Sequence, residues 1–125
     1  MKLASIRLVT DDLPALTAFY SALTNTEPVT PFGPGDYAEL HTAGSIIALA
    51  AGAAVKRYNN GAAEAAANRS AILEFEVGDV DAERARLSEQ VTDWVQEPTT
   101  QPWGYRSMLF RDPDGNLINL YSAGH

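Results

Sequence analysis

The sequence predicts an α+β fold built from two βαβββ modules within a single domain of 125 residues. Three observations lead to this prediction. Short segments of alternating apolar and polar residues, typical of half-buried strands, are separated by turn residues. Each half of the chain opens with one such segment, and apolar residues at helical spacing follow it. The order strand, helix, strand, strand, strand then occurs twice, and an internal repeat says more about a fold than any single motif.

The first module, residues 1–50, is predicted to open with a strand at 3–10 and a helix from Leu13 to Leu23. Asp11 and Asp12 can cap this helix, and Pro14 falls in its first turn, where proline is tolerated. Proline and glycine divide the remaining residues into three short strands, which are 29–32, 37–41 and 45–50. Alternation in the first strand separates Ile6 and Leu8 on one face from Ser5, Arg7 and Val9 on the other.

Residues 51–69 contain mostly alanine, glycine and asparagine, and we interpret them as a linker or a loosely docked helix. Residues 62–67 have helix propensity but no apolar stripe.

The second module, residues 70–125, opens with a strand at 71–77 and a helix that Asp79 can cap. Further strands are expected at 91–96, 106–111 and 116–122, with a long turn at 98–104. Asp112-Pro113-Asp114-Gly115 has the composition of a tight turn, so we reject a metal-binding or catalytic role for its carboxylates. Alternation in the first strand of this module separates Leu73, Phe75 and Val77 from Ile72, Glu74 and Glu76. Neither module could bury its sheet alone, but together they can form one sheet with the helices on its outer face.

Composition excludes several classes of function. The net charge is −7 and the sequence pI is near 4.6, so we expect neither nucleic acid nor an anionic membrane as a partner. The absence of cysteine excludes disulfides, thiolate catalysis and cysteine-ligated zinc. No segment has the length of a membrane span and none has the pattern of a signal peptide. We therefore expect a soluble protein in the cytoplasm.

Particular motifs give the chain a family resemblance. The most specific are Trp103-Gly104-Tyr105-Arg106 and the segment 110–121, and residues 5–20 and 74–81 match the openings of the two modules. With these motifs the chain resembles the vicinal oxygen chelate superfamily, which includes glyoxalase I, extradiol dioxygenases, fosfomycin-resistance enzymes and bleomycin-resistance proteins. The resemblance implies that each βαβββ module curls into half of a cup.

The resemblance also implies where a metal ion would bind. Metal-dependent members carry His, Gln or Glu at inward-facing positions of the first and last strands of each module, and here those positions are Ser5, Ala48, Ile72 and Asn119. None of the four is a good ligand for a first-row metal. His41 shares a strand face with Glu39, and Glu74 or Glu76 could in principle add to them, whereas we expect His125 to be mobile. We predict neither a metal nor another cofactor.

The candidate ligand-binding residues are those expected to face into the cup or to wall it. Arg7 either pairs with Glu74 or Glu76, joining the two modules, or anchors a ligand. Trp103 either walls a pocket for a flat ligand or packs at the rim or at a dimer contact. The predicted ligand-binding residues are Arg7, Tyr37, His41, Glu74, Glu76, Trp103, Tyr105 and Asn119, and Phe32 and Tyr121 are further candidates for an aromatic lining.

Three functions are compatible with this sequence. We favour a metal-independent protein that binds and sequesters a small drug-like or natural-product-like molecule with a planar aromatic part, as the resemblance to bleomycin-type antibiotic-resistance proteins implies. The first alternative is a lyase, isomerase or dioxygenase that uses a rebuilt metal site or Glu74 or Glu76 as a base. The second is a structural or regulatory module whose cup is filled by side chains. Family resemblance also implies a homodimer.

Overall fold

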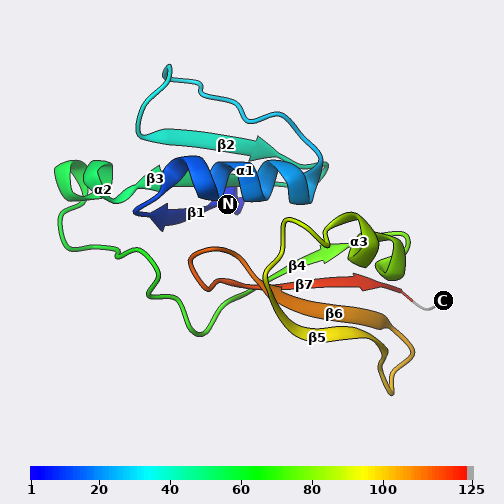
Figure 1. Ribbon diagram of the computed structural model, residues 1–125. Coiled ribbons are helices and arrows are strands. Elements are labelled where there is room, and N and C mark those ends of the chain that lie inside the picture. Colours follow the sequence, from blue (N-terminus) through cyan, green and yellow to red (C-terminus); the bar gives the residue numbers. More distant parts are fainter. Residues whose placement is uncertain (124–125) are drawn as a thin grey trace. The chain divides into compact units, whose positions relative to one another are not determined.

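A computed structural model describes residues 1–123 and divides the chain into two compact units, Met1–Ala67 and Asn68–His125. In the described residues, the first unit has one sheet with helices α1 and α2 packed against it, and the second has one sheet with helix α3 (Figure 1), which confirms the α+β class. That both units belong to one domain stays a prediction, and the expectation for His125 lies outside the described residues. Within residues 1–123, no helix has the length and apolar character needed to cross a membrane.

The first unit contains a three-stranded sheet in the order β1-β3-β2. Strand β1 runs parallel to β3, and β2 runs antiparallel to it. Helix α1 packs on β2 and β3 and buries an apolar side that includes Phe19 and Tyr20. Asp12 caps α1 by accepting a hydrogen bond from the backbone N–H of Ala15 at 3.1 Å. The elements are β1 (Ser5–Thr10), α1 (Leu13–Thr24), β2 (Tyr37–His41) and β3 (Ile46–Ala51).

The strand expected at 29–32 does not form, so this prediction was wrong. Only an isolated bridge remains, in which the backbone groups of Val29 and Glu39 exchange two hydrogen bonds of 2.8 Å. Pro28 and Pro31 have no N–H to donate, and proline therefore interrupts pairing on both sides of the bridge. Gly33, with φ of 86°, then turns the chain back toward residue 30.

The segment 51–69 does contain a helix, but it lies outside residues 62–67, where the sequence has helix propensity. Helix α2 spans Gly52–Tyr58 and contacts β3 and β1. Its one buried apolar residue is Val55. Residues 62–67 offer only alanine and Glu64, so a helix there would have no comparable side chain to bury, and short helices need such burial.

The second unit repeats the strand arrangement of the first. Its sheet has the order β4-β7-β6-β5, with the first strand of the unit at one edge and the last strand beside it. The first unit has the same order, with the Val29 bridge in the place that β5 takes here. This correspondence confirms the internal repeat. The elements are β4 (Ile72–Glu76), α3 (Val80–Arg86), β5 (Asp93–Thr100), β6 (Arg106–Arg111) and β7 (Leu117–Ser122).

The Asp112-Pro113-Asp114-Gly115 segment is the expected turn between β6 and β7. The buried carboxylate of Asp112 accepts hydrogen bonds from the backbone N–H groups of Asp114 and Asn116, both at 2.9 Å. Gly115 has a φ of 86°, which L side chains rarely adopt. These contacts support a structural role for Asp112.

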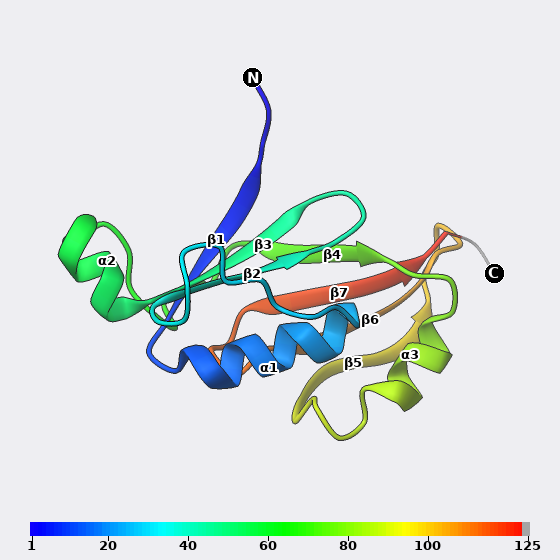
Figure 2. The same ribbon diagram turned by 90° about the horizontal axis from the view of Figure 1, so that it is seen from above.

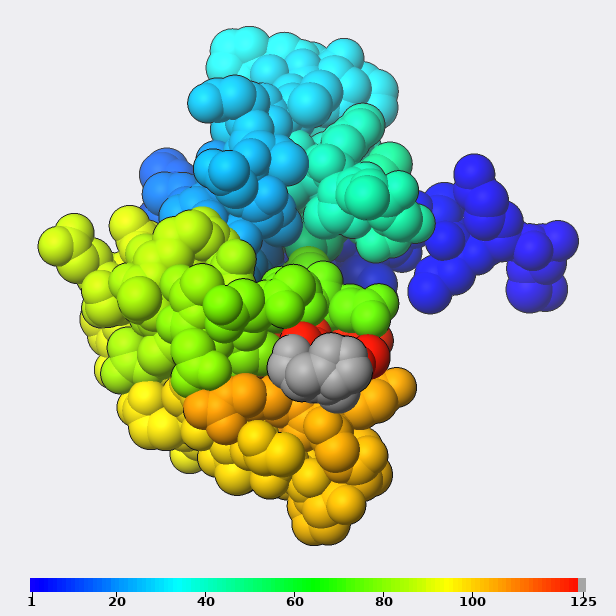
Figure 3. All heavy atoms as spheres, turned by 90° about the vertical axis from the view of Figure 1, so that its right-hand side faces the viewer, coloured from blue at the N-terminus to red at the C-terminus, as the bar shows by residue number. Residues whose placement is uncertain are grey.

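The N-terminal residues extend beyond the sheet of the first unit. Residues 1–4 precede β1 and form the start of the blue segment in Figures 2 and 3. Met1 and Leu3 are exposed.

Candidate ligand-binding site

One face of the sheet in the first unit carries a row of polar side chains. The register places Arg7 of β1 opposite Ala48 of β3, and Ala48 opposite Glu39 of β2. Residues directly opposite one another share a sheet face, and so do residues two positions apart on a strand. Arg7, Tyr37, Glu39 and His41 therefore lie on one face. Ala48, whose side chain is only a methyl group, lies between them on the central strand and is buried.

Three of these side chains form a hydrogen-bonded chain along β2. The hydroxyl of Tyr37 donates to Oε2 of Glu39 at 2.6 Å, and Nε2 of His41 lies 2.7 Å from Oε1 of the same carboxylate. Burial and the bond to Glu39 raise the pKa of Tyr37 to about 12. The bonds from Tyr37 and His41 hold the pKa of Glu39 below its ordinary value. Tyr37 is thus a neutral donor at neutral pH.

The first unit contains a cavity of about 550 Å³. Arg7 and Tyr37, two of the predicted residues, line it together with Phe32. Nη2 of Arg7 donates to Oδ1 of Asn59 across 3.4 Å. Three further residues line this cavity and were not predicted from the sequence: Arg57 and Tyr58, which end helix α2, and Asn59, which follows it. The only available signal was the presence of charged and aromatic residues at 56–58 in an otherwise featureless segment.

The second unit contains a smaller cavity of about 270 Å³, and four of the predicted residues line it. They are Glu74 of β4, Trp103 and Tyr105 of the loop before β6, and Asn119 of β7. Tyr121 also lines it, and its ring stacks on that of Tyr105 with centroids 5.6 Å apart and planes 1° from parallel. Ser107, which the sequence analysis did not single out, completes the lining.

One polar group of a residue that lines this second cavity lacks a hydrogen-bond donor. Nδ2 of Asn119 donates to Oε2 of Glu74 at 2.9 Å, and the two residues are paired in register across β4 and β7. Oδ1 of Asn119 is buried, and no donor from the described residues reaches it. Buried polar atoms are normally hydrogen-bonded, so an acceptor in this position is expected to receive a donor from water or from a ligand.

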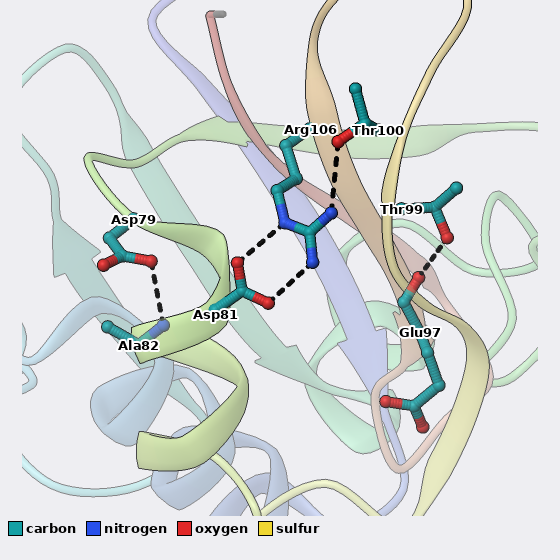
Figure 4. A network of polar contacts seen from close by, with 7 residues as sticks. All are labelled: Asp79, Asp81, Ala82, Glu97, Thr99, Thr100 and Arg106. Carbon is teal, nitrogen blue, oxygen red and sulfur yellow. Dashed lines mark hydrogen bonds and ion pairs between the residues drawn. The ribbon is translucent and has the colours of Figure 1, made fainter. Parts of the chain in front are cut away.

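The loop that carries Trp103 and Tyr105 is held at both ends. The backbone N–H of Gln101 donates to the carbonyl of Tyr105 at 2.7 Å, and Gly104 adopts a φ of 97°. Figure 4 shows Arg106 bound to Asp81 on α3 through two hydrogen bonds of 2.7 and 2.8 Å. These bonds hold the pKa of Asp81 below its ordinary value. The aromatic walls are therefore attached to an ordered strand end.

Two predicted residues, His41 and Glu76, line neither of these two cavities. The expected ion pair between Arg7 and Glu74 or Glu76 would join the two units, and it stays a prediction. Trp94 of β5 packs edge-on against Phe110 of β6, with centroids 5.4 Å apart.

The side chains at the four positions where the family would bind a metal do not fit one. The groups present are the hydroxyl of Ser5, the methyl group of Ala48, the aliphatic chain of Ile72 and the amide of Asn119. The nitrogen of this amide already binds Glu74. Residues 1–123 also contain no group of three or more His, Cys, Asp or Glu side chains that could hold a metal ion. The lack of the usual ligands agrees with the sequence analysis.

Comparison with known proteins identifies the family. The model of the Glyoxalase/Bleomycin resistance protein/Dioxygenase superfamily matches residues 2–120, and the chain belongs to this superfamily. No curated protein matches the sequence.

Solved structures share the fold at low sequence identity. A glyoxalase/bleomycin resistance protein/dioxygenase family enzyme from Burkholderia phytofirmans PsJN is similar, with a TM-score of 0.85, 17% identity and coverage of 98% of each chain. A glyoxalase-related enzyme from Fulvimarina pelagi has a TM-score of 0.82 and 21% identity, covering 98% of this chain and 88% of its own. A glyoxalase/bleomycin resistance protein/dioxygenase from Nocardioides has a TM-score of 0.80 and 21% identity, covering 100% and 85%. At these identities the likeness shows the fold alone.

Proposed function

We propose that this protein is a metal-independent binding protein that sequesters a small molecule in the cavity of its second unit. The observation that carries the proposal is Asn119, which lines a cavity with aromatic walls and whose buried Oδ1 has no donor among the described residues. An unsatisfied buried acceptor costs roughly 1–3 kcal/mol, which a ligand that supplies the donor would recover.

The aromatic walls favour a flat ring system as the ligand. Trp103 is 69% exposed, and it lies beside the stacked pair of Tyr105 and Tyr121. Aromatic pairs contribute about 0.5–1.5 kcal/mol beyond the area that they bury. A cavity of about 270 Å³ accommodates one ring system with a donor group more readily than a whole large drug.

The charge of the cavity favours a cationic or amino-substituted ring. Glu74 is the one carboxylate that lines it, next to the unsatisfied oxygen of Asn119. A ligand amine could donate to both oxygens, and hydrogen bonds to a charged group are roughly twice as strong as neutral ones.

The side chains present support binding over the enzymatic alternative. The metal-ligand positions carry no suitable donors, and the titratable groups at the cavity are Glu74 and the two tyrosine hydroxyls. A binding protein needs only the shape and the acceptors described above. We retain the homodimer implied by the family as a further expectation, which light scattering of the purified protein would test.

The test is calorimetric titration with proflavine, a flat tricyclic cation with two amino groups, and with acridine, its unsubstituted analogue. We expect one molecule of proflavine per chain at this cavity, weaker binding of acridine, and loss of binding in Trp103→Ala. Trp94→Phe is the matched control, because Trp94 packs on Phe110 and does not line the cavity. Proflavine should be recovered unchanged.

Binding that survives both Trp103→Ala and Asn119→Ala would contradict the proposal, as would failure of both compounds to bind. Chemical conversion of a bound ring compound, lost in Glu74→Gln, would instead favour the enzymatic alternative.

A further inference from the structure

We infer that the cavity of the first unit is a second binding site, which takes an organic carboxylate carrying a flat apolar body. This site is separate from the proposed site in the second unit, and its chemistry is the opposite. The cavity contains a guanidinium group, Arg7, beside aromatic side chains.

Within the first unit, residues 1–67, Arg7 forms no ion pair with a carboxylate. Four other arginines of the described residues do form ion pairs, and their partners are Asp36, Asp81, Glu83 and Glu97. The one hydrogen bond from the Arg7 guanidinium in this part of the chain is the bond of 3.4 Å to the neutral amide oxygen of Asn59. A guanidinium has five N–H donors in a planar fork that matches a carboxylate. Most of this donor capacity is therefore available to a ligand.

The charged side chains that line the cavity leave one positive charge in excess. They are Arg7, Asp36 and Arg57, and Arg57 neutralises Asp36 through two contacts of 3.3 Å to the same carboxylate oxygen. The chain as a whole carries a net charge of −7. A locally positive cavity in such an acidic chain favours an anion by short-range contact, since the overall charge gives an anion no long-range attraction.

Nearby side chains offer the apolar part of a ligand a surface. Phe32 is 85% exposed and Tyr58 is 73% exposed, and both lie at this cavity. The ring of Phe32 is also 5.8 Å from that of Tyr37, with the planes tilted by 46°. Ala50 and Ala54 line the cavity with small side chains that leave room between these rings. Covering the exposed rings would contribute roughly 25 cal/mol per Å² of apolar surface.

The polar groups of Tyr37 and Glu39, near Arg7, are already hydrogen-bonded and do not compete with Arg7 for an anion. The hydroxyl proton of Tyr37 is committed to Glu39, and the carboxylate of Glu39 is bonded on both oxygens, by Tyr37 and by His41. Glu39 does not line the cavity. The guanidinium is then the principal group that would bind a carboxylate, which makes Arg7 the residue to substitute.

The probe is 2-naphthoate, titrated calorimetrically against the full chain, with 2-naphthamide as the uncharged analogue of the same shape. We expect naphthoate to bind more tightly than naphthamide. Arg7→Gln should lower the affinity for naphthoate at least tenfold and leave the affinity for naphthamide nearly unchanged. The affinity of Arg7→Lys for naphthoate should lie between those of the unmodified chain and Arg7→Gln. Arg86→Gln is the matched control, because Arg86 pairs with Glu83 in the second unit.

Phe32→Ala provides a second variant that does not depend on charge. Phe32 is so exposed that its removal should leave the fold intact, and it should weaken naphthoate and naphthamide by similar factors. The affinity for naphthoate should be the same in the Trp103→Ala variant as in the unmodified chain. It should also be the same when the protein is saturated with proflavine. These arms separate failure of this inference from failure of the proposed function.

Three results would overturn the inference. The first is no binding of naphthoate at millimolar concentration, and the second is binding that is insensitive to Arg7→Gln and Phe32→Ala. The third is a coupling between Arg7→Gln and Glu74→Gln in a double-mutant cycle of unfolding free energies, because that would show Arg7 already committed to an ion pair.

Discussion

Replacement of Asp112 by alanine should destabilise the second unit more than any other single change in its turns. Asp112 is 4% exposed, and its carboxylate accepts hydrogen bonds from two backbone N–H groups and, at 2.7 Å, from Nδ2 of Asn116. Asn116 is itself 5% exposed, and its Oδ1 accepts from Nδ2 of Asn68 at 3.1 Å. Oδ1 of Asn68 in turn accepts from the backbone N–H groups of Ser70 and Ala71 just before β4.

The magnitude follows from the donors that the substitution leaves unpaired. Asp112→Ala abandons the buried N–H of Asn116 and its side-chain amide, and each unsatisfied buried group costs roughly 1–3 kcal/mol. The N–H of Asp114 is less buried and adds less. We expect a total loss of about 3–5 kcal/mol in the free energy of unfolding. Asp112→Asn keeps an oxygen for the backbone donors, but its new N–H₂ group faces the N–H₂ group of Asn116, and two donors cannot bond. The free energy of unfolding should therefore fall by about 1–2 kcal/mol.

The assay is urea unfolding followed by circular dichroism, with the free energy extrapolated to water. Asp93→Ala is the control, because Asp93 is exposed on β5 and should change stability by no more than about 0.5 kcal/mol. A loss of less than about 1 kcal/mol in Asp112→Ala would refute the reasoning. Proflavine binding by Asp112→Asn should be unchanged, since Asp112 does not line the cavity.

Further predictions concern the loop, a pH effect, helix α2 and metals. Gly104→Ala places a side chain at a φ of 97° and should lower stability by about 1 kcal/mol and weaken proflavine binding, as urea unfolding and calorimetry would show. The pKa of Glu39 is lower in the folded protein than in the unfolded one, so its contribution to stability is present above the unfolded pKa and is lost as pH falls through the folded pKa. Glu39→Gln should flatten the acid limb of urea midpoints measured from neutral pH to about pH 3, and an unchanged limb would contradict this. Val55→Ala removes the buried side chain of α2, so it should lower the free energy of unfolding by about 1–3 kcal/mol and speed amide hydrogen exchange in residues 52–58. Exchange as slow as in the unmodified protein would show that other contacts hold α2. Ni²⁺, Mn²⁺, Zn²⁺ or Fe²⁺ should leave the melting temperature unchanged, whereas a rise of several degrees would reveal a site that the side chains do not suggest.

Short-range interactions explain which parts of the fold were predictable. Asp12 and Asp79 cap their helices through bonds to backbone groups three residues away, and Asp112 organises its turn within four residues. Such contacts are visible in the order of residues alone. The strand predicted at 29–32 does not form, because Pro28 and Pro31 have no N–H to donate on either side of the Val29 bridge. For residues 51–69 the sequence left a linker and a loosely docked helix open, and the burial of Val55 accounts for a helix at α2 and not at 62–67.

The sequence by itself determined the repeat, the superfamily, the absence of the usual metal ligands and the side of β4 on which Glu74 lies. Alternation has a period of two residues, so the face of a strand is a local property. Only the tertiary structure decided that Glu74 meets Asn119, that Tyr105 stacks on Tyr121, and that Arg7 shares a cavity with the end of α2. These contacts join residues 16 to 52 positions apart in the chain. Strand register and helix docking set them, and neither is encoded by neighbouring residues.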